Sequence, residues 1–283
     1  MRRPWAGMAT VLLAVSLLAG CQGTKTGADD GQAGEEAAQT TSKTELIVFA
    51  AASLTETLTE IAEMYKEVNP DVTVIYTFDS SGALKTQIQE GADCDIFISA
   101  AQKQMDQLDC RADPSVNTEG LDFVLWEDRF DLVENKVVLA VPEGNPAGIE
   151  TFEDLGTEKL KLICLGNEDV PVGVYSAEIL TNLGILEQLE ADSKITYGSN
   201  VKEVTTQVKE ASVDCGIIYA TDGFSAGLTV VDEAGEGLCR RVVYPAAVLN
   251  CSGNQEAARE FLNFLVTDDC KAVFEAVGFS MAP

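Results

Sequence analysis

The chain has 283 residues, and its 46 acidic side chains outnumber its 19 basic ones, which gives a formal net charge of −27 at pH 7. This charge argues against binding of nucleic acid or of an anionic membrane surface, because both would repel the protein. The sequence contains no histidine. It therefore lacks the most common general base, the usual zinc ligand and the partner required for Ser-His and Cys-His nucleophile pairs.

Residues 1–20 are predicted to be a secretory signal peptide. Arg2 and Arg3 provide a positive start, an apolar stretch covers residues 8–19, and small residues precede Cys21. The apolar stretch is too short to span a bilayer. Because Cys21 directly follows Leu-Ala-Gly, as in bacterial lipoproteins, we predict that it carries a lipid that anchors the protein to the cell membrane outside the cytoplasm. An ordinary signal peptide with a chance cysteine is the alternative.

The segment after this signal is rich in Gly, Ala, Thr, Gln and Glu and has almost no large apolar side chain before Thr44. Such a composition cannot bury enough surface to fold, so residues 21–43 are predicted to be a flexible tether. Residues 44–283 suffice for one large domain or two small lobes.

The eight cysteines do not form a Cys-x-x-Cys motif, so neither a redox centre nor a zinc knuckle is indicated. With Cys21 lipidated, an odd number remains, and these cannot all pair within one molecule. Cys94, Cys164 and Cys215 lie in or beside apolar strand-like runs and are interpreted as small buried hydrophobic residues. Whether the other cysteines form disulfides stays open.

From residue 44 onward, short apolar runs alternate with helical patterns. In the first part we expect strands at 45–50, 72–78 and 95–99 and helices at 54–68, 83–90 and 102–108. The pattern restarts with strands at 136–141, 160–165, 194–197, 215–219 and 241–249 and helices at 175–189, 201–209, 254–266 and 270–277. This alternation predicts an α/β protein with mostly parallel sheets. We expect two lobes, one made of 44–135 with 238–283 and the other of 136–237.

Four strand-to-helix junctions share one chemical character. Ser53 follows the first strand, Ser80 and Ser81 follow the second, the run 169–173 precedes a helix, and 199–201 opens another. Ligands of parallel α/β sheets bind at the carboxyl ends of the strands, where helix N-termini meet. Taken singly, each junction can be explained as helix capping. Together they predict an anion site made of N–H groups, hydroxyls and helix dipoles without a formal positive charge.

Tyr219 ends the apolar run 215–219, where its hydroxyl would emerge at the same sheet edge. The alternative is a core tyrosine whose hydroxyl bonds to backbone.

These segments resemble the bacterial periplasmic molybdate-binding proteins, the capture subunits of molybdate ABC importers. The resemblance covers nearly all of the chain after Thr44, in the same order, and rests on FAAASL, FDSSGAL, DIFISAAQKQMD, EDVPVGVY, SNVKEV, GIIYATD and YPAAVL. It implies a two-lobed periplasmic-binding-protein-like fold of type II, with the ligand in a cleft between the lobes.

The resemblance also implies which groups hold the oxyanion. These are the hydroxyls of Ser53, Ser81 and Tyr219 and the backbone N–H groups of Ser53, Ser81, Val172 and Val201. The family commonly has alanine where this chain has Val172, and whether Ser80 or Ser81 touches the ligand stays open. The implied ligand is molybdate or tungstate, held by these same residues, with no cation site and no cofactor. The implied partners are the permease and ATPase of an ABC importer, to which a monomer delivers its ligand by hinge closure.

Two other classes of function fit the residues less well. Paired carboxylates such as Asp93 and Asp95 lie beside no candidate nucleophile or base, so we predict that the chain is not an enzyme. A carrier for sulfate or ferric iron is the alternative, although an iron site should show clustered tyrosines or carboxylates and only Tyr219 qualifies.

Overall fold

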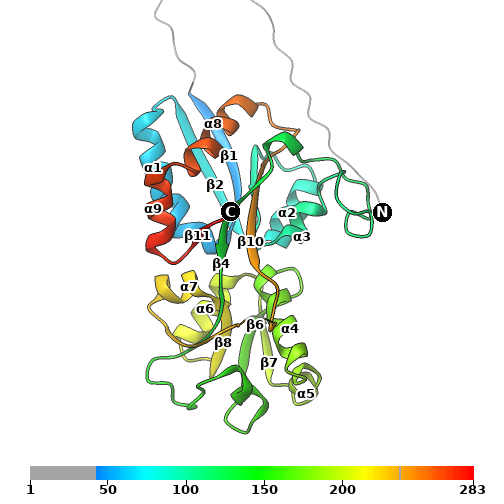
Figure 1. Ribbon diagram of the computed structural model, residues 1–283, viewed down its shortest axis with the longest axis vertical. Coiled ribbons are helices and arrows are strands. Elements are labelled where there is room, and N and C mark those ends of the chain that lie inside the picture. Colours follow the sequence, from blue (N-terminus) through cyan, green and yellow to red (C-terminus); the bar gives the residue numbers. More distant parts are fainter. Residues whose placement is uncertain (1–42, 236) are drawn as a thin grey trace, which may run out of the picture. The chain divides into compact units, whose positions relative to one another are not determined.

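The computed structural model describes residues 43–235 and 237–283, and it contains two sheets with helices packed on them (Figure 1). The predicted signal peptide, the lipidated Cys21 and the tether up to residue 42 lie outside the described residues. Among the residues described, no helix is both long enough and apolar enough to cross a membrane.

The first sheet has six strands in the order β11-β4-β10-β3-β1-β2. Their bounds are β1 Thr44–Ala51, β2 Val72–Asp79, β3 Ile96–Ile98, β4 Phe130–Asn135, β10 Val242–Val248 and β11 Ser280–Met281. Strand β1 pairs parallel with β2 and β3, whereas β10 runs antiparallel to β3 and β4. The carboxyl ends of β1, β2 and β3 therefore meet at one edge.

The second sheet has the order β7-β6-β8-β5-β9. Its strands are β5 Val137–Val141, β6 Ile163–Gly166, β7 Ile195–Gly198, β8 Cys215–Tyr219 and β9 Thr229–Glu233. Strands β6, β7 and β8 are parallel, while β5 runs antiparallel to β8 and β9.

The prediction of an α/β fold with two helix-flanked sheets is confirmed, but both sheets are mixed rather than mostly parallel. The chain leaves the first sheet through β4 and enters the second through β5, and it returns through β9 and β10. Each of these four strands pairs only in antiparallel fashion within its sheet. Parallel pairing is restricted to the strands joined by helical crossovers, as the geometry of such crossovers requires.

Helices cover both faces of the first sheet (Figure 1). They are α1 Thr55–Val68, α2 Ser81–Gln89, α3 Gln102–Asp106, α8 Gln255–Leu265 and α9 Asp268–Ala276. Successive residues of β1 serve different cores: Val48 and Ala50 pack in the cluster that includes residues of α1, α8 and α9, whereas Phe49 packs with residues of α2 and α3. This alternation follows from the two-residue period of a strand and explains why the whole run is apolar.

The second sheet is covered by α4 Pro171–Asn182, α5 Leu186–Ala191, α6 Val201–Lys209 and α7 Ala220–Ala226. A single helix over 175–189 was expected, but Gly184 adopts a φ of +72° and separates α4 from α5. This left-handed conformation, which glycine adopts without steric cost, ends the first helix.

Candidate binding site

The loop after β1 places Ser53 at the edge of the first sheet. It lies in the short 3-10 helix η1, Ala52–Leu54, immediately before α1, and only 4% of its surface is exposed. Its Oγ is 2.9 Å from the Tyr244 hydroxyl, which also accepts a hydrogen bond from Asn135 Nδ2 at 3.2 Å. When Tyr244 donates to Ser53, the Ser53 proton is free to point at a ligand.

The two serines after β2 have different tasks. Ser80 is the N-cap of α2: its Oγ accepts from Ala83 N at 3.1 Å, and its own N–H donates to Asp79 Oδ1 at 2.7 Å. Ser81 is fully buried, and its Oγ accepts from Ala100 N at 2.9 Å, so its hydroxyl proton remains available. Its N–H belongs to the first helical turn, which has no intrahelical acceptor. This geometry favours Ser81 over Ser80 as a donor.

The N-terminus of α4 offers one main-chain donor. Pro171 has no N–H, and the N–H groups of Gly173 and Val174 both donate to Val170 O, at 2.8 and 3.2 Å. The first-turn N–H of Val172 is the one left for a ligand. The Val172 side chain is fully buried within the core cluster that includes Val170 and Tyr175.

Helix α6 begins at Val201 and is capped by Asn200, whose side chain accepts from Glu203 N at 3.0 Å. Asn200 Nδ2 also reaches Asp79 Oδ1 at 3.3 Å, so the cap of a second-sheet helix is hydrogen-bonded to the end of a first-sheet strand. This contact fixes the α6 N-terminus close to the carboxyl end of β2.

Tyr219 ends β8 and is 1% exposed. Its ring meets those of Tyr244 and Tyr175 edge-on, with centroids 5.9 and 6.4 Å away. Complete burial raises the pKa of its hydroxyl well above the ordinary value, so the group is a neutral donor at pH 7. Among the described residues this hydroxyl has no hydrogen-bond partner. A buried hydroxyl left unpaired is costly, which makes it an indicator of a ligand.

These junctions surround one small cavity of about 10 Å³, which we call the serine cavity. Four of the five predicted binding residues line it, namely Ser53, Ser81, Val201 and Tyr219. The fifth, Val172, does not, although the two residues before it do. The other lining residues are Ala51, Ala52, Asp79, Ser80, Ala100, Val170 and Pro171.

The serine cavity has no basic side chain in its lining and a single carboxylate, that of Asp79. One oxygen of this carboxylate is occupied by the N–H of Ser80 and the amide of Asn200. The residues around the cavity thus offer mainly hydroxyl and N–H donors, which suit a ligand rich in acceptor oxygens. Asp79 was not predicted, although it precedes the serines directly, because its hydrogen bonds depend on how α6 packs.

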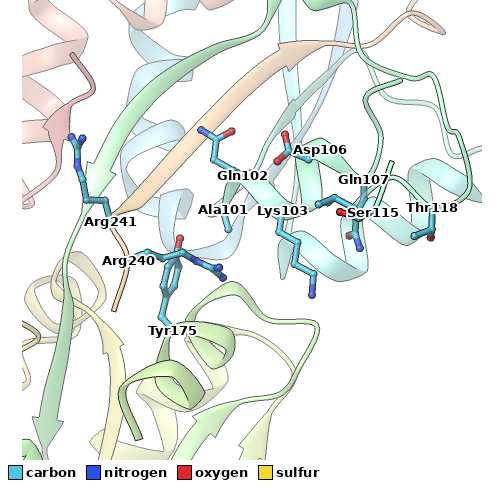
Figure 2. A pocket seen from close by; sticks show the side chains of 11 residues that line it. Ala101, Gln102, Lys103, Asp106, Gln107, Ser115, Thr118, Tyr175, Arg240 and Arg241 are labelled. Carbon is cyan, nitrogen blue, oxygen red and sulfur yellow. The ribbon is translucent and has the colours of Figure 1, made fainter. Parts of the chain in front are cut away.

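A larger cavity of about 490 Å³, the arginine cavity, has Lys103, Arg240 and Arg241 in its lining (Figure 2). Figure 2 shows Arg240 beside Tyr175, and the guanidinium lies 5.4 Å from the centre of that ring. Since Tyr175 also packs against Tyr219, a tyrosine pair lies between the two cavities.

The three cysteines that were predicted to be buried are buried in the structure. Cys94, Cys164 and Cys215 are at most 4% exposed, as the apolar runs indicated. All seven described cysteines are free thiols.

Asp95, one of the paired carboxylates noted in the sequence, has a structural role. It accepts hydrogen bonds from Ile47 N and Ser252 Oγ at 2.8 and 2.5 Å, so it stabilises the start of the first sheet.

The chain is similar to known proteins in sequence. The family described as bacterial extracellular solute-binding protein matches residues 46–280. A Bacillus subtilis protein named as a candidate substrate-binding lipoprotein of an ABC transporter is 32% identical, with 95% of each chain covered. The molybdate-binding protein of Haemophilus influenzae is also 32% identical over 82% of this chain and 89% of its own.

Among solved structures, the periplasmic molybdate-binding protein of Azotobacter vinelandii aligns with a TM-score of 0.72. The alignment covers 84% of this chain and 100% of that one at 22% sequence identity. At this identity the likeness concerns the fold, and it agrees with the expected periplasmic-binding-protein architecture.

Proposed function

Because this chain belongs to the family of bacterial extracellular solute-binding proteins, we propose that it captures molybdate outside the cytoplasm and delivers it to the permease and ATPase of an ABC importer. Members of this family bind solutes and are not enzymes, so the prediction of no enzymatic activity is confirmed. Relatives named molybdate-binding proteins, such as that of Haemophilus influenzae, support the choice of ligand.

The observation that carries the proposal is the Tyr219 hydroxyl, which is buried without a partner among the described residues and belongs to the lining of the serine cavity. Ser53 and Ser81 line the same cavity with hydroxyl protons available, and the N-termini of α2, α4 and α6 surround it. A tetrahedral dianion has acceptor oxygens in all directions and so can be bound by these donors together. In a chain of net charge −27, such short-range donors are what can hold an anion.

The ligand set we propose is Ser53, Ser81, Val172, Val201 and Tyr219, with Val172 and Val201 acting through their N–H groups. Tungstate has the same shape and charge as molybdate and is proposed as a second ligand. Sulfate and ferric iron remain the alternatives that the binding test below addresses.

The size of the cavity supports a proposal of hinge closure. A space of about 10 Å³ accommodates roughly one water molecule, which is smaller than a tetrahedral oxyanion. The residues that line the cavity come from both sheets, so the cavity enlarges when the sheets separate.

We propose lobes at 44–135 with 238–283 and at 136–237, because the strands of the first sheet fall in the former and those of the second in the latter. A monomer anchored by a lipid on Cys21 completes the proposal, in keeping with the lipoprotein name of the Bacillus subtilis relative.

The test is calorimetric titration of residues 44–283, which contain both sheets and their cores, with molybdate, tungstate, sulfate, phosphate and ferric iron in turn. We expect tight binding of molybdate and tungstate and weak or absent binding of sulfate and phosphate. Protonated phosphate is disfavoured because its O–H would find few free acceptors in a donor-rich site. Binding of sulfate or ferric iron in preference to molybdate would contradict the proposed ligand.

Replacing Ser53 with alanine should weaken molybdate binding by about 1–3 kcal/mol, the contribution of a hydrogen bond to a charged group. Stability should also fall by about 1 kcal/mol, because the buried Tyr244 hydroxyl loses Ser53 as its acceptor and keeps only the hydrogen bond that it accepts from Asn135. Titration calorimetry and thermal unfolding measure the two effects, and an unchanged dissociation constant would remove Ser53 from the site.

A further inference from the structure

Asp222 is the third residue of α7, and its side chain is completely buried. Neither carboxylate oxygen has a hydrogen-bond partner among the described residues, but Lys202 Nζ lies 3.0 Å from Oδ1. The ammonium therefore forms a close ion pair with this carboxylate. Burial raises the pKa of Asp222 to about 6, and Lys202 opposes that rise. A buried carboxylate of this kind needs a nearby cation, because an unpaired buried charge destabilises the fold.

Lys202 has a second carboxylate partner in a different part of the fold. Its Nζ donates to both oxygens of Glu56, at 2.8 and 2.7 Å. Glu56 is the second residue of α1 and half of its side chain is exposed, whereas Lys202 is the second residue of α6. The lysine therefore joins a helix of the second sheet to a helix of the first.

The two ion pairs differ in what sheet separation would do to them. Helices α6 and α7 both cover the second sheet and contact each other, so the pair of Lys202 with Asp222 moves as one piece. The pair of Lys202 with Glu56 crosses from one sheet to the other and would break. Both ends lie close in sequence to the serine cavity, since Lys202 follows Val201 and Glu56 comes three residues after Ser53.

An ion pair between an exposed lysine and a glutamate contributes little to stability, partly because two flexible side chains must be ordered. Here the buried Asp222 already restrains the ammonium of Lys202. Part of the entropic cost of ordering the lysine therefore does not arise when it binds Glu56. The hydrogen bond between Asn200 and Asp79 crosses between the same sheets two residues before Lys202, at the start of the same helix.

We propose that Lys202 is a positioning residue: Asp222 holds its ammonium in place, and Glu56 receives it when the two sheets come together, which fixes the α6 N-terminus over the serine cavity. The effect on ligand release rests on the proposed function. The effect on the arrangement of the two sheets does not.

The test uses Glu56→Gln, which removes the pair between sheets and leaves Lys202 with Asp222. Glu60→Gln is the matched control, because Glu60 is exposed on the same helix one turn away and the charge change is identical. We expect molybdate to dissociate about two to five times faster from Glu56→Gln than from wild type, with no change in the control. The difference in dissociation rate between Glu56→Gln and wild type should become smaller in 1 M salt, because a Debye length of ~3 Å screens a partly exposed ion pair.

A second readout needs no ligand. Small-angle scattering of the ligand-free proteins should give a larger radius of gyration for Glu56→Gln than for wild type and Glu60→Gln. If no oxyanion binds, the proposed function fails while this measurement still tests Lys202. Equal scattering together with equal dissociation rates, where a ligand binds, would overturn the positioning role.

Discussion

Alanine in place of Gly82 is expected to weaken molybdate binding by a factor of roughly one hundred or more, equivalent to losing about two hydrogen bonds to a charged ligand. A Cβ at this position would lie 2.2 Å from Asp169 O and 2.9 Å from Asp169 Cβ. Gly82 is in the first turn of α2, and Asp169 precedes α4, so the clash is between a helix of the first sheet and the loop that leads into a helix of the second. The added methyl would hold the two sets of donors apart by about 1 Å, given ordinary contact distances.

The same substitution should leave folding intact, because alanine favours a helix over glycine by about 1 kcal/mol. Titration calorimetry and thermal unfolding would therefore report lost affinity with an unchanged or higher melting temperature. Gly253→Ala is the control, since a Cβ at Gly253 would have no atom within 4 Å and the φ of this residue is not positive. Wild-type affinity in Gly82→Ala would mean that the approach of α2 to Asp169 is not needed for binding.

Phenylalanine in place of Tyr219 is expected to change affinity and stability in opposite directions. The buried hydroxyl has no partner among the described residues, so its removal should raise the free energy of unfolding of the ligand-free protein by about 1 kcal/mol. The same hydroxyl is proposed to donate to the oxyanion, and its loss should weaken binding by about tenfold to a hundredfold.

Tyr76→Phe provides the control for this pair of effects. The Tyr76 hydroxyl is also buried without a partner among the described residues, but Tyr76 lies in β2, stacked on Phe78, and does not line the serine cavity. It should therefore show the gain in stability without the loss of affinity. Should Tyr219→Phe bind molybdate as tightly as wild type, the hydroxyl is not a ligand donor and the central support of the proposed function is lost.

Much of the fold could be predicted from the sequence because local patterns encode it. The apolar runs at β1, β2, β3, β5 and β8 and the helical periodicity of α1, α6 and α8 appear in the structure within a few residues of the expected positions. Strands β4, β9 and β11 and helix α7 were not predicted. Residues of β9 are mostly half-buried or exposed, so the strand has little apolar signal, and its place depends on pairing with β5.

The residues of the candidate site could likewise be predicted only in part from the sequence. The serines, the helix starts and Tyr219 could be identified from the sequence, because capping residues and strand ends have local signatures. Which of them share a cavity was decided by tertiary packing, and Val172 stays outside its lining. Glu56 and Lys202 are 146 positions apart, and neither belongs to a pattern that indicates the other. Such pairs arise only when two sheets meet, because an ion pair depends on distance in space and leaves no periodic trace in the chain.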